Sequence, residues 1–278
     1  MGRARWLDAV QVGPYHVGLM DDHESAAPVR PRRRAIYLLP NLLTTGCLFS
    51  GFYAIVAAID GNFERAGIAI FVAMLFDGLD GRVARMTHTE SAFGKEYDSL
   101  ADMVAFGVAP AIVSYQWGVA RIAEYGRAWG RLGWLAAFFY AVTAALRLAR
   151  FNTRVATQDK RYFEGLPSPS AAAVVSGFVW ASTEWREPGL RGLIAAFTVT
   201  AVAGALMVSP LSFPSFKNFD LMRPVRFAWL VVAVLVFVVI AGDPSRALLI
   251  SFGGYALFPP LAWMVRRLRR LLRRRERA

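Results

Sequence analysis

The sequence has 278 residues, of which 56% are hydrophobic and 19% are charged, and its formal net charge is +12. This balance is typical of a membrane protein and excludes an ordinary soluble domain. The basic charge predicts no nucleic acid partner, because most of it is expected to face anionic lipid headgroups.

Three regions are predicted along the chain. Residues 1–35 form a polar N-terminal tail that ends in a run of arginines, and residues 266–278 form a basic C-terminal tail. Between them, residues 36–265 are expected to form one transmembrane domain. No cleavable signal peptide is expected, because the first 30 residues contain no apolar stretch of the required length.

The central region contains apolar segments that are long enough to cross a bilayer, which takes about 17–25 residues of helix. They predict an all-α fold, a polytopic membrane helix bundle with about eight transmembrane helices. The segments lie near residues 38–59, 64–86, 95–119, 131–150, 168–184, 190–208, 224–241 and 245–265.

The distribution of Lys and Arg predicts the orientation. If both termini are cytoplasmic, 25 of the 32 Lys and Arg residues lie on that side and 7 on the other. This asymmetry obeys the positive-inside rule and requires an even number of spans. We therefore expect an integral protein of a bacterial-type inner (cytoplasmic) membrane. The tail at 266–278 is interpreted either as a helix that binds anionic membrane lipids or as a topology anchor without a specific ligand.

Four aspartates lie in the second apolar segment and at the start of the third. Insertion of an aspartate at the centre of a transmembrane helix costs about 2.5–3.5 kcal/mol, so these four anions need cations. Asp77 and Asp80 are spaced i, i+3, and Asp98 and Asp102 are spaced i, i+4, so each pair shares one face of a helix. Oxygen ligands from two facing helices suit two divalent ions, Mg²⁺ or Mn²⁺. The alternative is an ion-coupled transporter with a carboxylate relay, but no internal repeat is visible and the aspartates lie near helix ends.

The aspartates belong to a longer pattern, D-x2-DG-x2-AR-x8-G-x3-D-x3-D, which spans residues 77–102. The pattern is similar to the signature of the CDP-alcohol phosphotransferases, integral membrane enzymes that transfer a phosphatidyl group from a CDP-lipid to an alcohol and release CMP. The resemblance implies that Asp77, Asp80 and Asp98 are metal ligands. It implies that Asp102 is both a metal ligand and the general base. The asymmetry of Lys and Arg predicts that this active site lies near the cytoplasmic face.

The same resemblance implies a site for the cytidine nucleotide. Gly81, Ala84 and Arg85 match the part of the signature that accommodates it, although Arg85 alternatively neutralises a phosphate or pairs with an aspartate. Asn41 and Thr44, at the start of the first span, are expected to contact the cytidine. Their alternative role is to cap the first helix.

Arg147 and Arg150, at the end of the fourth segment, bear on the acceptor. They are interpreted either as positive-inside anchors or as a pair that binds a carboxylate in bidentate geometry. Among common acceptor alcohols, serine carries a carboxylate. The Arg-Phe-Asn and Gly-Leu-Pro-Ser-Pro segments within residues 147–170 are similar to those of the phosphatidylserine synthase branch. We therefore expect Arg147, Arg150 and Asn152 to bind the acceptor.

Together, these resemblances imply transfer of the phosphatidyl group from CDP-diacylglycerol to the hydroxyl of L-serine. The products are phosphatidylserine and CMP, and the reaction is expected to be an in-line displacement assisted by two metal ions. The alternative acceptors are inositol phosphate, glycerol 3-phosphate and choline. The family resemblance also implies a homodimer.

Overall fold

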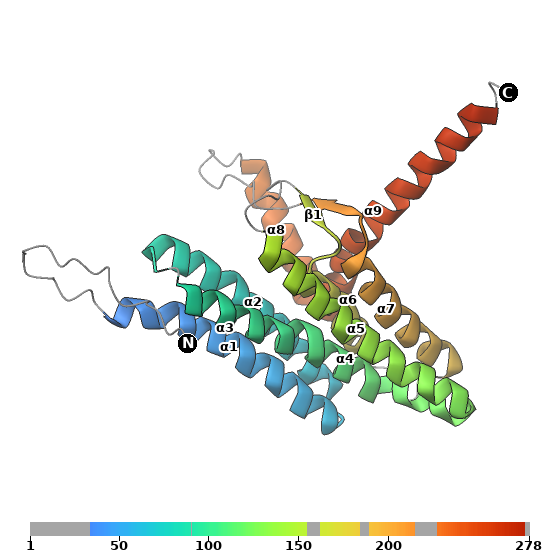
Figure 1. The fold of residues 1–278 in the computed structure, drawn as a ribbon, viewed down its shortest axis with the longest axis horizontal. Helices are drawn as coiled ribbons and strands as arrows, with labels where there is room; N and C mark the ends of the chain where they lie inside the picture. The colour runs from blue at the N-terminus through green and yellow to red at the C-terminus, as the bar shows by residue number, and fades with distance from the viewer. Residues whose placement is uncertain (1–33, 90, 155–161, 184–188, 215–226, 276–278) are drawn as a thin grey trace, which may run out of the picture. The chain divides into compact units, whose positions relative to one another are not determined.

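The computed structural model describes residues 34–89, 91–154, 162–183, 189–214 and 227–275, and these are mainly helical (Figure 1). The all-α membrane fold is confirmed, because a helix occupies the position of each of the eight predicted segments. Residues 1–33 of the predicted N-terminal tail (residues 1–35) lie outside the described residues, and the last two residues of that tail begin α1. The helical segments are α1 (Arg34–Ile59), α2 (Phe63–Thr87), a continuous run over 92–125, α5 (Arg127–Arg154), α6 (Ser168–Ala181), α7 (Leu190–Val208), α8 (Phe227–Gly242) and α9 (Pro244–Arg275).

Five helices of the described part are long and apolar enough to cross a membrane: Leu38–Ile59, Ala92–Tyr125, Arg127–Thr153, Leu190–Val208 and Pro244–Arg267. The other three helical segments, α2, α6 and α8, do not meet these criteria of length and hydropathy. Helix α2 carries charged side chains in its second half, and α6 and α8 have only 14 and 16 residues. A hydrocarbon core of about 30 Å needs about 20 residues of straight helix. The protein is therefore an integral membrane protein, and its helices differ in length.

The third segment departs from the regular helix that the sequence predicts. It consists of α3 (Ala92–Asp102), the π-helical turn η1 (Met103–Val108), α4 (Ala109–Ser114), a second π-helical turn η2 (Tyr115–Val119) and the 3₁₀-helix η3 (Ala120–Tyr125). Hydropathy reports the length of such a segment but not its helical pitch. π-helical turns inside α-helices occur frequently at functional sites. The first one here directly follows Asp102.

Small residues bring the helices around this segment into close contact. A Cβ atom on Gly51 of α1 would lie 2.6 Å from the Cα atom of Ala105 in η1. A Cβ atom on Gly67 of α2 would lie 2.7 Å from the Cβ atom of Trp180 in α6. Small residues allow membrane helices to approach closely, where they gain van der Waals contact. Glycine therefore fixes the distances of α1 and α2 from their neighbours.

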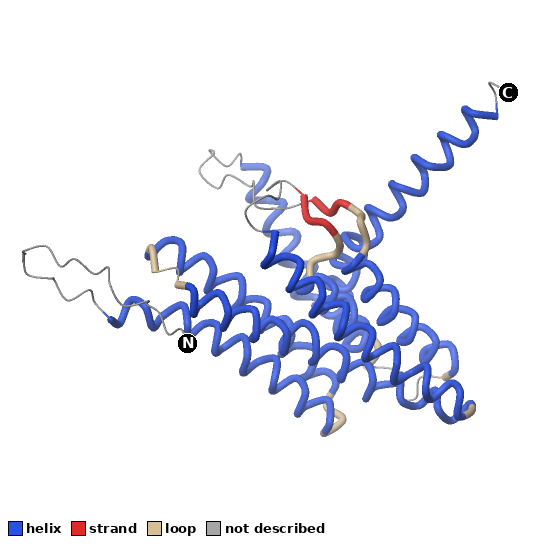
Figure 2. The backbone as a smooth tube through the Cα atoms, viewed as in Figure 1, coloured by secondary structure: helices blue, strands red, loops and turns tan. Residues whose placement is uncertain are grey.

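Two short strands form the part of the fold that the sequence analysis did not predict. β1 (Tyr162–Glu164) pairs antiparallel with β2 (Ser212–Pro214), and the two strands are the red segments of the tube in Figure 2. Strands of three residues are too short for a period-two pattern to be visible. Gly165 follows β1 with φ +81°, and a Cβ atom there would lie 2.2 Å from the Met207 carbonyl oxygen. The pairing of β1 with β2 and the close approach of Gly165 to Met207 hold the chain in place just before α6.

Helix α9 begins at a capped turn and includes the basic residues that follow the last predicted span. The Arg246 N–H and the Ser245 hydroxyl donate hydrogen bonds to Asp243, which hold the pKa of this carboxyl below its usual value. The helix continues without a break to Arg275, so the basic tail extends a membrane helix. The guanidinium of Arg267 lies over the Trp263 ring, 5.1 Å from its centroid.

Candidate active site

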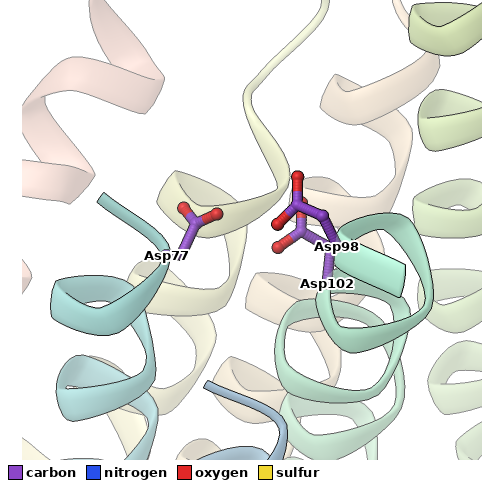
Figure 3. A group of neighbouring side chains, drawn as sticks. All are labelled: Asp77, Asp98 and Asp102. Carbon is purple, nitrogen blue, oxygen red and sulfur yellow. The ribbon is translucent and has the colours of Figure 1, made fainter. Parts of the chain in front are cut away.

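Three carboxylates from two helices converge in the part of the chain that the structure describes. Asp77 on α2 and Asp98 and Asp102 on α3 each present an oxygen, and these oxygens lie within 4.8 Å of one another. Figure 3 shows Asp77 directed across the gap toward the other two, which project from one face of α3. The i, i+4 spacing of Asp98 and Asp102 produces this shared face. The sequence therefore predicted the pairing on α3 correctly.

The turn between α2 and α3 sets their approach. Helix α2 ends at His88, which adopts the left-handed conformation with φ 53°. Helix α3 begins at Ser91, whose hydroxyl accepts a hydrogen bond of 2.9 Å from the Gly94 N–H. A serine N-cap of this kind stabilises a helix start by about 1 kcal/mol. A Cβ atom on Gly94 would lie only 3.1 Å from that hydroxyl, so glycine in the signature accommodates the cap.

The fourth aspartate of the signature, Asp80, lies beside this group and makes a different contact. Asp80 is only 5% exposed, and its Oδ2 accepts a hydrogen bond of 2.8 Å from the Thr44 hydroxyl of α1. Its charge interacts with those of Asp77 and Asp98. The four signature aspartates are thus neighbours. Three present oxygens to one another, while one oxygen of Asp80 is directed to α1.

This set of side chains fits a hard divalent cation. Asp102 Oδ1 is buried and has no hydrogen-bond partner in the described chain. Buried carboxylate oxygens are normally paired, and two like charges 4 Å apart repel by about 4 kcal/mol at an effective dielectric constant of about 20. Oxygen ligands from carboxylates are what Mg²⁺ and Mn²⁺ prefer. A metal-binding site is the arrangement that accounts for both the burial and the proximity of these anions.

A cleft of about 380 Å³ opens beside the carboxylates. All five residues predicted to bind nucleotide line it, and so do two of the signature aspartates. The guanidinium of Arg85 lies close to Gly81, where the absence of a side chain gives it room: a Cβ atom on Gly81 would lie 3.4 Å from its Nη1. The lining residues are Pro40, Asn41, Thr44, Asp80, Gly81, Ala84, Arg85, Thr89, Ser91, Gly94, Lys95, Glu96, Asp98, Ser99, Phe151 and Asn152.

The three residues predicted to bind the acceptor have three different environments. Arg147 is partly buried near the end of α5, and its Nη1 donates a hydrogen bond of 2.8 Å to the Ser168 hydroxyl of α6. Its Nε is buried without a hydrogen-bond partner in the described chain, and its charge interacts with that of Asp102. Arg147 is therefore a cation close to Asp102 whose Nε–H remains available to donate a hydrogen bond.

Arg150 and Asn152 do not join Arg147. Arg150 forms an ion pair of 2.5 Å with Glu164 of β1, and both side chains are about one-third exposed. The Nδ2 of Asn152 donates a hydrogen bond of 2.9 Å to the Ser99 hydroxyl on α3. Asn152 lines the cleft, whereas Arg150 does not. The expected pair of arginines is thus separated, because the strand β1 provides a carboxylate for one of them.

Sequence reasoning missed two residues that support these groups. Ser168 lies within the Gly-Leu-Pro-Ser-Pro segment, but its contact with Arg147 joins residues 21 apart in the chain. Tyr140 is fully buried, and its hydroxyl donates a hydrogen bond of 3.0 Å to the Phe106 carbonyl in η1. A buried tyrosine in an apolar segment carries no sequence signal for such a bond.

Comparisons with known proteins relate the chain to enzymes of known activity. The model of the CDP-alcohol phosphatidyltransferase family matches residues 37–211. A CDP-diacylglycerol–serine O-phosphatidyltransferase of Helicobacter pylori is 36% identical over 239 residues, which cover 85% of this chain and 94% of the relative. An enzyme of the same name from Mycobacterium tuberculosis is 34% identical over 233 residues, covering 80% and 77% of the two chains.

An archaeal relative extends the comparison. The archaetidylserine synthase of Methanothermobacter thermautotrophicus is 38% identical over 178 residues, which cover 63% of this chain and 69% of the relative. The family match includes the signature aspartates, the cleft and the segment from Arg147 to Ser168. The chain therefore belongs to the CDP-alcohol phosphatidyltransferase family.

Proposed function

We propose that the protein is a CDP-diacylglycerol–serine O-phosphatidyltransferase, which converts CDP-diacylglycerol and L-serine into phosphatidylserine and CMP. The observation that carries the choice of acceptor is the position of Arg147. This partly buried cation interacts with the charge of Asp102, and its buried Nε has no hydrogen-bond partner among the residues that the structure describes. A guanidinium binds a carboxylate in a planar, bidentate geometry. The names of the bacterial relatives, which specify serine, support the same acceptor.

Two divalent ions, Mn²⁺ or Mg²⁺, are held by Asp77, Asp80, Asp98 and Asp102 in this proposal. When bound, they neutralise the diphosphate and stabilise the oxygen that leaves in the displacement. The proximity of Asp77, Asp98 and Asp102 supports this assignment, since these oxygens lie within 4.8 Å of one another.

The cleft beside the carboxylates receives the CMP half of the lipid substrate. Asn41, Gly81, Ala84 and Arg85 line it, and the guanidinium of Arg85 balances phosphate charge. Thr44 lines the same cleft, but its hydroxyl is bonded to Asp80.

The acceptor serine lies between Arg147 and Asp102. Arg147 binds the serine carboxylate, and Ser168 keeps the guanidinium in place. Arg150 and Asn152 support the acceptor site indirectly, because they tie the end of α5 to β1 and α3. In this proposal the serine hydroxyl approaches Asp102 Oδ1, which is buried and has no hydrogen-bond partner in the described chain.

In the chemical step, Asp102 accepts the proton of the serine hydroxyl as a general base. The serine oxygen forms a bond to the phosphorus that carries diacylglycerol, and the bond from that phosphorus to the bridging oxygen breaks. The electron pair stays with this oxygen, which leaves as part of CMP. Positioning and charge neutralisation supply most of the catalysis in phosphoryl transfer.

The same proposal places the site at the cytoplasmic face of an inner membrane, with both termini cytoplasmic. The asymmetry of 25 to 7 Lys and Arg residues supports it. Further elements of the proposal are a homodimer and anionic lipids bound at the basic end of α9, where Arg266, Arg267 and Arg269 are exposed.

The test uses the purified full-length protein with Mn²⁺, CDP-diacylglycerol and each candidate acceptor in turn. We expect release of CMP and formation of labelled lipid with L-serine, and not with inositol phosphate, glycerol 3-phosphate or choline. The matched control is Asp102→Asn, which should abolish both products. Turnover with another alcohol would overturn the choice of serine, and turnover by Asp102→Asn would overturn the role of that residue.

A further inference from the structure

The hydroxyl of Thr44 has a specific acceptor among the signature aspartates. Thr44 and Asp80 are 4% and 5% exposed, and the distance between Thr44 Oγ1 and Asp80 Oδ2 is 2.8 Å. The same hydroxyl lies 3.1 Å from the Pro40 carbonyl oxygen. A hydroxyl has one proton to donate, and the hydrogen bond to an ionised acceptor is the stronger. The proton is therefore directed to Asp80.

We infer that Thr44 is a positioning residue for the metal site: it orients the Asp80 carboxylate from the neighbouring helix α1. Its bond holds one oxygen of Asp80, which leaves the other oxygen for an ion. Hydrogen-bond partners of ligating carboxylates commonly tune metal affinity, and their removal costs about 10- to 100-fold. This role differs from the cytidine contact expected from the sequence, and it rests on the divalent-ion site of the proposed function.

The chain provides a matched control in the next residue. Thr45 is also a threonine of α1 with a bond to α3, since its Oγ1 lies 2.9 Å from the Tyr97 hydroxyl. Its side chain is exposed and contacts none of the signature aspartates through a hydrogen bond that the structure describes. Loss of this hydroxyl therefore reproduces the loss of a bond between helices without touching Asp80.

The experiment measures Mn²⁺ binding directly, by electron paramagnetic resonance of the purified full-length protein without lipid substrate or serine. We expect Thr44→Val to weaken Mn²⁺ binding about tenfold, while Thr44→Ser and Thr45→Val stay within about threefold of the wild type. Thr44→Ser keeps the hydroxyl, so it shows whether the hydroxyl or the shape of the residue matters. If the valine variant does not fold, Thr44→Ala, which also lacks the hydroxyl, is measured in its place with the same expected loss.

A double-mutant cycle tests whether Thr44 acts through Asp80. In an Asp80→Asn background, Thr44→Val should change Mn²⁺ affinity by less than about twofold, because the bond partner is already altered. An unchanged Mn²⁺ affinity of Thr44→Val with a higher KM for CDP-diacylglycerol would overturn the inference in favour of a nucleotide contact. Equal losses in Thr44→Val and Thr45→Val would also overturn it. A wild-type protein that binds no Mn²⁺ would overturn the metal site itself, and with it the proposed function.

Discussion

The hydroxyl of Tyr140 on α5 donates a hydrogen bond of 3.0 Å to the main-chain carbonyl of Phe106, inside the π-helical turn that follows Asp102. Both residues are fully buried. A carbonyl in a π-helical turn is thereby satisfied by a side chain from another helix. The position of α5 and the irregular pitch of the third segment depend on each other.

Tyr140→Phe should destabilise the fold by about 1–3 kcal/mol, because it leaves a buried carbonyl without this donor. The midpoint of thermal unfolding in detergent measures the effect. Tyr53→Phe is the control, since Tyr53 is 40% exposed on α1. Equal midpoints for the two variants would show that the bond contributes nothing.

The two arginines at the end of α5 should respond differently to replacement by lysine. Arg147→Lys should lower kcat/KM for serine at least about tenfold, because an ammonium lacks the planar pair of donors. Arg150→Lys should stay within about threefold, because its partly exposed ion pair with Glu164 contributes about 1 kcal/mol or less. Steady-state kinetics with varied serine distinguishes them, and the reverse order would assign the carboxylate to Arg150.

Ser168→Ala should raise KM for serine about threefold to tenfold and leave KM for CDP-diacylglycerol unchanged. The Ser168 hydroxyl accepts a hydrogen bond from the charged guanidinium of Arg147, and such a bond contributes about 1.5–3 kcal/mol. Only part of this is expected to affect serine binding, because Ser168 acts through Arg147. Ser170→Ala, in the same turn of α6, is the control. A loss confined to the lipid substrate would contradict the proposed place of Arg147.

Removal of divalent ions should reverse the effect of Asp102→Asn on stability. In EDTA the variant should unfold at a higher temperature than the wild type, because one of three mutually repelling carboxylates is gone. In excess Mn²⁺ the order should invert, because ligand binding stabilises the wild type by mass action. Asp60→Asn, on the exposed turn after α1, should do neither. A wild-type midpoint that does not move on addition of Mn²⁺ would contradict the site.

Gly165→Ala should be strongly destabilising, by about 1–3 kcal/mol for the backbone conformation alone. The residue has φ +81°, and a Cβ atom would lie 2.2 Å from the Met207 carbonyl oxygen. Gly189→Ala is the control, because nothing lies within 4 Å of its Cβ position and its φ is −63°. Thermal unfolding of both variants provides the comparison. Similar midpoints would show that the turn after β1 tolerates a side chain.

The sequence predicted the helices well because each apolar segment is long and the lipid requirement is simple. The five residues that it assigned to the nucleotide all line the cleft, while their role as nucleotide contacts stays a prediction. It did not predict β1, because a three-residue strand shows no periodicity. It therefore also missed the ion pair that Arg150 forms with Glu164 of this strand. The partners Thr44 and Asp80 lie 36 residues apart, and no local pattern links them.

The close approach of Gly51 to Ala105 has a consequence for how acceptor preference can change. Where two backbones touch, the distance between α1 and η1 cannot be adjusted by exchanging side chains. The carboxylates of α2 and α3 stand next to this rigid contact, whereas Arg147 and Ser168 belong to α5 and α6. Under the proposed function, mutations on those two helices should therefore alter the alcohol that is accepted while the phosphate chemistry stays intact. An ancestral enzyme could acquire a new headgroup in this way without rebuilding its catalytic centre.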